Sequence, residues 1–192
     1  MRFPKSFANR VPQNLMVLAA LACTAAVATP AAVAPDVQAA VWTPKELEFQ
    51  YVGFTTKYTC DGLHQKMKAL LTMLGAQQLQ VRSAGCVGSA APETVTGVYI
   101  KMNVLQPAAG AAKDKAVPAL WQPVDLLARR DPIDAAADCE LIEQIKQKIL
   151  PLFATRNIQY SSACAAHQLL VGGTKLKADV LMPEYAPKTA AR

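Results

Sequence analysis

The chain contains two stretches that resemble each other, and each carries two cysteines at matching places. Residues 60–84 align with residues 139–163, and a gap of one residue continues the match. The aligned pairs include Cys60 with Cys139, Gln65 with Gln144, Leu71 with Leu150, Gln80 with Gln159 and Cys86 with Cys164. Self-similarity at a fixed spacing is the mark of a duplicated structural unit. The sequence therefore predicts two copies of one fold unit.

Both stretches also close on the same short pattern. After two further residues are lost in a loop, residues 101–107 align with residues 177–183 as Lys-x-Asn/Asp-Val-Leu-x-Pro. The apolar residues suit a strand, and proline is a residue that ends one. Each copy is therefore expected to finish on a β-strand.

Hydrophobic periodicity gives each copy the order β-α-β-β. In the first copy, alternation predicts a strand over residues 46–55, and helical spacing of leucines and a methionine predicts a helix over residues 63–74. Thr59 or Asp61 can cap the start of this helix, and Gly75 can end it. Two further strands are expected over residues 78–83 and 95–105.

The second copy repeats this order with a weaker first strand. Residues 120–127 form that strand, and Pro123 interrupts it, which favours a place at a sheet edge. A helix follows over residues 142–152, and Asp138 can cap it. The remaining strands are expected over residues 158–162 and 176–181.

The expected fold class is α+β, a disulfide-stapled frame of two tandem βαββ repeats. They would form a two-layer α/β sandwich with the helices packed on a largely antiparallel sheet. Whether both copies share one sheet or form two small sheets stays open. The expected organisation is a signal peptide (1–39), the first βαββ unit (40–107), a linker loop (108–119), the second βαββ unit (120–183) and a flexible C-terminal tail (184–192).

The four cysteines of the repeat are expected to form two structural disulfides. A crossover through a helix makes the flanking strands parallel, so the helix start and the end of the second strand share one sheet edge. This geometry pairs Cys60 with Cys86 and Cys139 with Cys164. Each bridge closes a loop of about 25 residues and would contribute on the order of 3 kcal/mol. Their wide spacing favours a structural role over a redox site.

The first residues are typical of an export signal. Three basic residues precede an uncharged apolar run over residues 15–28. Small residues favour cleavage after Ala39, with cleavage after Ala28 as the earlier alternative. An uncleaved anchor and a lipid-modified Cys23 stay open as rivals. We therefore expect a periplasmic or extracellular protein that meets the membrane only transiently, unless the anchor is kept or Cys23 carries a lipid.

Charge narrows the expected partners. The full chain has a formal net charge of +6, and removal of residues 1–39, which hold three basic residues and one acidic residue, leaves +4. The chain shows no Lys/Arg stripe and no interleaved aromatic residues, so nucleic acid is not an expected partner. An envelope protein or an anionic envelope polymer is the expected partner.

The sequence contains no recognisable catalytic constellation. His64 and His167 match neither HxH nor HExxH and fall at non-equivalent places of the repeat, so we expect no metal and no cofactor. A GxSxG nucleophile elbow is missing. Asp61, Asp138 and Glu140 stand where a helix start favours negative charge, and we interpret them as capping residues.

The expected function is that of a non-catalytic binding or structural protein, acting through a sheet face, a sheet edge or the repeat interface. His64, His167 and Phe54 are weak binding candidates, and Phe54 is included because it breaks the alternation of its strand. Two alternatives stay open. One is a hydrolase-like enzyme with a carboxylate or histidine site between the repeats, and the other is a secreted inhibitor that works through the loop over residues 87–94.

Overall fold

The computed structural model of the chain is an α+β structure, as the sequence pattern predicts. It describes residues 36–85, 91–109, 115–127, 137–162, 164 and 174–184, which all lie within one compact unit, Pro35–Arg192. The elements are β1 (Val37–Val52), α1 (Cys60–Met73), β2 (Gln77–Ala84), β3 (Val95–Pro107), β4 (Val117–Asp125), α2 (Cys139–Lys148), the 3-10 turn η2 (Leu150–Leu152), β5 (Thr155–Ser161) and β6 (Lys175–Pro183).

The strands in the described ranges form a single six-stranded sheet in the order β2-β3-β1-β4-β6-β5. Neighbouring strands are antiparallel throughout. Because β1 and β2 both run antiparallel to β3, they run in the same direction, as a crossover through α1 requires. β4 and β5 have the same relation to β6. One sheet, rather than two small ones, therefore carries the N-terminal half (37–107) and the C-terminal half (117–183).

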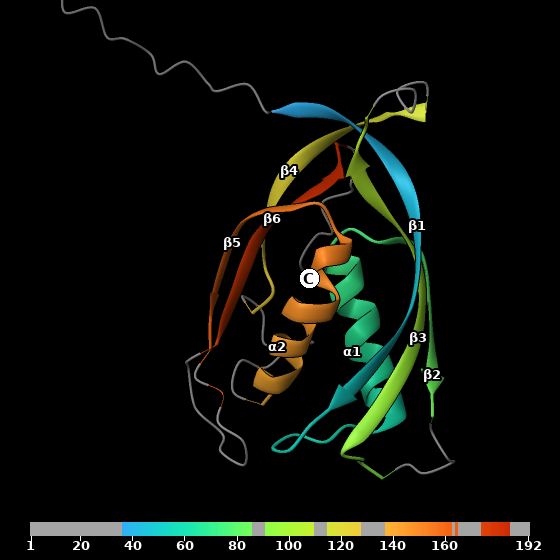
Figure 1. The fold of residues 1–192 in the computed structure, drawn as a ribbon, viewed down its shortest axis with the longest axis vertical. Coiled ribbons are helices and arrows are strands. Elements are labelled where there is room, and N and C mark those ends of the chain that lie inside the picture. Colours follow the sequence, from blue (N-terminus) through green and yellow to red (C-terminus); the bar gives the residue numbers. More distant parts are fainter. Residues whose placement is uncertain are drawn as a thin grey trace, which may run out of the picture. The chain divides into compact units, whose positions relative to one another are not determined.

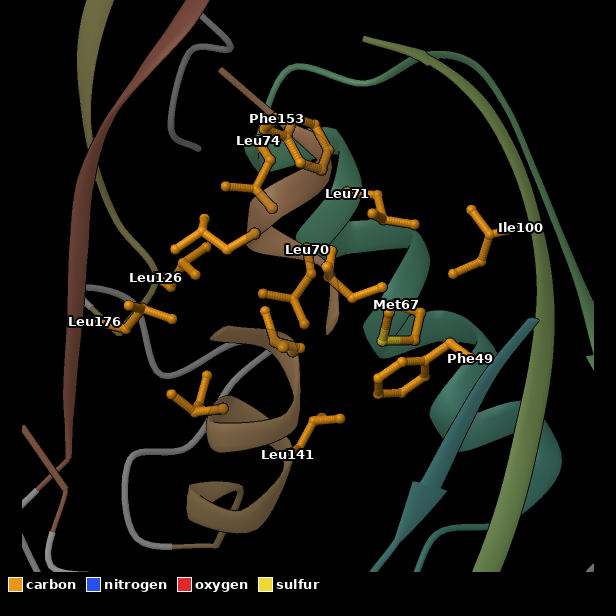
Figure 2. Close-up of a cluster of buried hydrophobic side chains, with 14 of the residues drawn as sticks. Phe49, Met67, Leu70, Leu71, Leu74, Ile100, Leu126, Leu141, Phe153 and Leu176 are labelled. Atoms are coloured by element: carbon orange, nitrogen blue, oxygen red, sulfur yellow. The ribbon is translucent and has the colours of Figure 1, made fainter. Parts of the chain in front are cut away.

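Both α1 and α2 lie on the same side of the sheet, which curves around them (Figure 1). Alternate strand residues point toward the helices, among them Phe49 of β1, Ile100 of β3 and Leu176 of β6. They pack in one cluster with helix residues such as Leu70 and Leu141 (Figure 2). Removal of apolar surface from water stabilises a fold by about 25 cal/mol per Å². One hydrophobic core therefore joins the two halves.

Local signals set both ends of α1. Thr59, and not Asp61, is the N-cap, since its side-chain oxygen accepts the N–H of Gly62 at 3.0 Å. At the other end Gly75 adopts a φ of +83°, and the N–H groups of Gly75 and the next residue return to carbonyls of the last turn. This is a Schellman motif, which needs a residue that tolerates positive φ. The predicted stop at Gly75 is confirmed.

β4 lies inside the sheet, between β1 and β6, so its predicted place at an edge is wrong. The prediction rested on Pro123, because proline lacks an N–H for the strand ladder. In the structure, β4 pairs with β1 only over residues 117–120. Pro123 lies beyond that pairing, where β4 has a strand partner on one side, as an edge strand does.

β1 begins well before the predicted strand, and this early part joins the two halves of the sheet. In the described residues, the pairs between β1 and β4 are Val37 with Leu120, Gln38 with Ala119, Ala39 with Pro118 and Ala40 with Val117. We call these pairs the central seam. β1 ends at Val52, and the last residues of the predicted strand form a bend instead. The central seam therefore depends on residues that the sequence assigns to the end of the leader.

A disulfide joins Cys139, the first residue of α2, to Cys164, which follows β5. Their Cα atoms are 5.8 Å apart, inside the range that a disulfide spans. This pairing is the predicted one. Cys60 is also disulfide-bonded. Its predicted partner, Cys86, lies outside the described residues, so the Cys60–Cys86 pairing stays a prediction that a non-reducing peptide map can test.

Replacement of Cys139 and Cys164 together by serine is expected to lower the free energy of unfolding by about 3 kcal/mol, because the unfolded chain is then released from a closed loop. Urea unfolding of the variant and of the parent protein measures the loss. As a control, reduction of the variant should have a smaller effect than reduction of the parent. Equal stability of the variant and the parent would show that the bridge does not stabilise the fold.

Candidate functional site

The side chain of His64 makes a hydrogen bond within the N-terminal half. Its Nε2 atom lies 3.0 Å from the carbonyl oxygen of Val81, so it connects α1 to β2. The other candidate histidine, His167, lies outside the described residues. Within the described ranges, no cluster of three or more His, Cys, Asp or Glu side chains could hold a metal ion. His64 is therefore a locally bonded histidine.

Asp138, at the start of α2, places its carboxylate in the N-terminal half. Its side chain is only 1% exposed, and Oδ2 accepts a hydrogen bond from Nζ of Lys66 at 2.7 Å. The hydroxyl of Tyr58 donates to Oδ1. Asp138 is the N-cap residue of α2, as the sequence predicts, but its side chain makes no cap hydrogen bond. Its carboxylate binds Lys66 of α1 and Tyr58, which precedes α1, instead of the backbone N–H groups at the start of α2.

Glu140 fastens the bend that follows β1. Its carboxylate accepts hydrogen bonds from the backbone N–H groups of Phe54 at 3.0 Å, Thr55 at 3.1 Å and Thr56 at 3.4 Å. Successive N–H groups that converge on one point form a concave site for an anion. Glu140 stands in the first turn of α2, where the sequence predicts a favourable negative charge, and it is also the anion that this bend binds. The side chain of Phe54 is 56% exposed beside it.

Gln144 and Lys148 continue the attachment along α2. The side-chain amide of Gln144 donates to the carbonyl of Val52 at 2.8 Å and accepts the Val52 N–H at 3.2 Å. Lys148 donates to the carbonyl of Gln50 at 3.0 Å. These bonds lie beyond the central seam, where β1 no longer pairs with β4. Side chains of α2 thus replace a neighbouring strand, and we call Asp138, Glu140, Gln144 and Lys148 the α2 clasp.

The charged side chains of the α2 clasp are hydrogen-bonded to other groups of the same chain, among them the hydroxyls of Tyr51 and Tyr58. The rings of Tyr51 and Tyr58 lie 4.8 Å apart by their centroids. Burial raises the pKa of both hydroxyls, and the neighbouring charges add to the rise, Glu140 at Tyr51 and Asp138 at Tyr58. Both tyrosines therefore stay protonated and donate hydrogen bonds. Through their hydrogen bonds to Glu140 and Asp138, the two tyrosines link the N-terminal half to the C-terminal half.

The raised tyrosine pKa values predict a loss of stability in alkali. Free tyrosine ionises near pH 10, so the unfolded chain releases these protons before the folded chain does. The stabilisation is fully present below about pH 10 and is lost as the pH rises toward the folded-state pKa values. Urea unfolding across this range should show the fall, and Tyr58→Phe should make it less steep. If the stability of Tyr58→Phe and Tyr51→Phe fell as steeply with rising pH as the stability of the parent protein, this account would be contradicted.

The outer face of the sheet, which is turned away from the helices, has a small apolar centre of its own. Ala40, Leu105, Ala119 and Leu181 are buried there, and Trp42 and Trp121 are half-buried against them. Trp42 of β1 stands opposite Leu105 of β3, and Trp121 of β4 stands opposite Leu181 of β6. The two tryptophans of the chain therefore cover the middle of the outer face.

A shallow pocket of 580 Å³ lies beside this centre, over β4, β5 and β6. Its polar side chains are Asp125, Asn157, Gln159, Lys177 and Asp179. The residues of β6 that alternate with these, Leu176, Ala178 and Val180, belong to the core. Since side chains alternate across a strand, Lys177 and Asp179 point to the outer face. The pocket therefore opens on the side of the sheet that the helices leave uncovered.

Ion pairs and an irregular strand shape the pocket. Nζ of Lys177 lies 2.7 Å from Asp125, and the amide of Asn157 donates to Asp179 at 2.7 Å. Asn157 has a φ of +54°, and the pairing of β5 with β6 shifts register at this place. The guanidinium of Arg156 lies 3.4 Å from Asp179 and 4.7 Å from the ring centre of Trp121. The register shift thus turns polar groups of β5 toward those of β6.

Sequence reasoning did not single out these pocket residues. Lys177 and Asp179 belong to the closing pattern of the repeat, and strand alternation alone places them on the solvent side. The register shift between Arg156 and Gln159 has no comparable sequence signal, so the pocket was not predictable. The loop over residues 87–94 is the predicted working surface of a secreted inhibitor, and its first part lies outside the described residues.

Comparisons with protein-family models, with curated protein sequences and with solved structures find no match for this chain. Among the helices that the structure describes, none is both long enough and apolar enough to cross a bilayer.

Proposed function

We propose that the chain is a non-catalytic binding protein of the periplasm or the extracellular space, and that it binds through the outer face of its C-terminal half. The contrast between its two polar sites carries this proposal. The carboxylate of Asp138 is only 1% exposed, whereas Lys177 and Asp125, which pair with each other in the pocket, are 50% and 29% exposed and can be reached by a ligand. Binding sites are concave and combine apolar walls with a few polar groups.

Export is part of this proposal. The Cys139–Cys164 bridge is of a kind that persists in oxidising compartments, outside the cytosol. The basic and apolar start of the chain is typical of a secretory signal. Both features support a place in the periplasm or beyond it, where an envelope protein or envelope polymer is the available partner.

The frame for binding consists of two tandem βαββ units in a two-layer α/β sandwich. The sheet order supports this, because it reads the same from either end when β1, β2 and β3 are exchanged with β4, β5 and β6. Ion pairs support it as well, since Glu46 with Lys101 and Asp125 with Lys177 take the same place in their halves. Gln78 and Asn157 share a positive φ at register shifts of β2 and β5.

A stretch of the first strand extends the sequence match between the units. Residues 40–47 are Ala-Val-Trp-Thr-Pro-Lys-Glu-Leu, and residues 119–126 are Ala-Leu-Trp-Gln-Pro-Val-Asp-Leu. The match aligns Trp42 with Trp121. It also puts Ala39 and Pro118, which pair with each other at the central seam, at equivalent positions. An approximate two-fold axis through the seam accounts for both observations.

Capture of partners from the native cell envelope tests the proposed function. The tagged protein is cross-linked in its own cells and purified under denaturing conditions, and its adducts are identified by mass spectrometry. An unrelated exported protein with the same tag is the control. A reproducible protein or glycan adduct, missing from the control, is expected. Identical adducts in both samples would contradict a binding role.

A further inference from the structure

The pocket on the outer face mixes hydrogen-bond acceptors with donors at close range. Asp125 and Asp179 are acceptors, Lys177 is a donor, and the amides of Asn157 and Gln159 are both. No single charge dominates, because Lys177 is paired with Asp125. A ligand that fits must therefore meet donors and acceptors side by side.

This mixture selects against strongly charged ligands. A phosphate or another polyanion would approach Lys177 but would also face the carboxylates of Asp125 and Asp179. A polyamine would approach those carboxylates but would face Lys177 and Arg156, whose guanidinium lies 3.4 Å from Asp179. A hydroxyl group, in contrast, donates and accepts at once and can satisfy either neighbour.

Groups for such hydroxyls remain open in the pocket. Oδ2 of Asp179 accepts from Asn157 and Arg156, whereas Oδ1 accepts no hydrogen bond within the described part of the chain. The amide nitrogen of Asn157 makes the bond to Asp179, and in the described residues no donor bonds to its side-chain carbonyl. Ile158, which also lines the pocket, is 48% exposed and supplies apolar surface.

From these observations we propose that the pocket binds a neutral polyhydroxylated ligand, a saccharide. Its volume of 580 Å³ falls in the range of about 300–1,000 Å³ of small-molecule sites. Ring hydroxyls meet Asp179, Asn157 and Gln159, and the apolar face of the sugar lies on Ile158. This inference rests on the proposed binding function and names its ligand class, which is the glycan of an envelope polymer or a free sugar.

Titration of the purified protein tests the ligand class. Binding is followed by ¹H–¹⁵N NMR with neutral mono- and oligosaccharides of glucose, mannose and N-acetylglucosamine, and with inorganic phosphate and spermine as charged probes. We expect saccharides to shift signals of β5 and β6 and the charged probes to leave them unchanged. A better response to oligosaccharides than to single sugars assigns the site to a polymer, and the reverse order assigns it to free sugar.

Matched variants of the two halves locate the binding. Asn157→Gly keeps the positive φ and removes the amide, and Gln78→Gly does the same at the equivalent register shift in β2. Loss of hydrogen bonds should weaken saccharide binding about tenfold in Asn157→Gly and leave it unchanged in Gln78→Gly. Gln159→Ala, with Gln80→Ala as its control, gives a second test if Asn157→Gly does not fold.

The outcomes separate the ligand class from the function. Tight binding of phosphate or spermine at the pocket, or saccharide binding that Asn157→Gly and Gln159→Ala leave unchanged, would overturn the saccharide assignment. If saccharides do not bind but a partner is still captured from the envelope, the ligand class is wrong and the binding function stands. If no saccharide binds and no partner is captured from the envelope, both proposals are overturned.

Discussion

A chain that begins at Ala40 is expected to be about 3–5 kcal/mol less stable than a chain that begins at Asp36, because each lost backbone hydrogen bond costs about 1 kcal/mol and apolar contacts are lost with it. Val37, Gln38 and Ala39 supply most of the central seam, which joins β1 to β4. Without them the two groups of strands lose most of their pairing, and the core, the apolar centre of the outer face and the α2 clasp are left to hold them together. Urea unfolding of the two chains measures the difference.

A truncation at the opposite end provides the control for this experiment. A chain that ends at Glu184 keeps the bond from the Glu184 N–H to the carbonyl of Pro118 and should unfold like the parent. Equal stability of the chains that begin at Asp36 and at Ala40 would show that the seam is dispensable. A contribution of the seam would favour the predicted alternative, cleavage after Ala28, over cleavage after Ala39, and an intact-mass measurement of the protein from its own cells can test this.

Asp138→Ala is expected to lower the free energy of unfolding by about 2–4 kcal/mol. Loss of one partner of a fully buried ion pair costs about 3–5 kcal/mol, and the value should be smaller here because the Lys66 side chain is 25% exposed. The hydroxyl of Tyr58 also loses its acceptor. Thermal or urea unfolding of Asp138→Ala, Lys66→Ala and the double variant gives the coupling between the two residues.

An exposed ion pair in the same sheet serves as the control for Asp138. Glu46 and Lys101 lie 2.9 Å apart, with both side chains more than half exposed. Exposed pairs contribute about 0–1 kcal/mol, so Glu46→Ala should change the stability little. A loss in Asp138→Ala no larger than the loss in Glu46→Ala would contradict the role of the α2 clasp.

Local patterns in the sequence predicted the elements well, because strand alternation and helix caps act over a few residues. Thr59 and Gly75 set the ends of α1 as such signals do. The start of β1 was missed because residues 37–40 resemble the small residues of a cleavage site. The match of Trp42 with Trp121 is visible in the sequence. A strand predicted around both tryptophans would place the start of β1 closer to the N-terminus.

Long-range contacts account for what the sequence did not predict. Asp138 and Glu140 stand at a helix start, where the local expectation is a capping role. In the structure the carboxylate of Asp138 binds Lys66 and Tyr58, and the carboxylate of Glu140 binds the bend after β1. These partners are more than 70 residues away along the chain, so no local pattern reveals them. The pocket depends in the same way on a register shift next to Asn157, which is a property of the paired strands.

Site-specific photo-crosslinking in the native envelope tests most directly whether the chain binds through the outer face of its C-terminal half. A photoreactive residue replaces Gln159 at the pocket in one variant, and the equivalent exposed residue Gln80 on β2 in a second. We predict a reproducible adduct from position 159 and none from position 80. An adduct from position 80 alone, or the same adducts from both positions, would contradict binding through the pocket face.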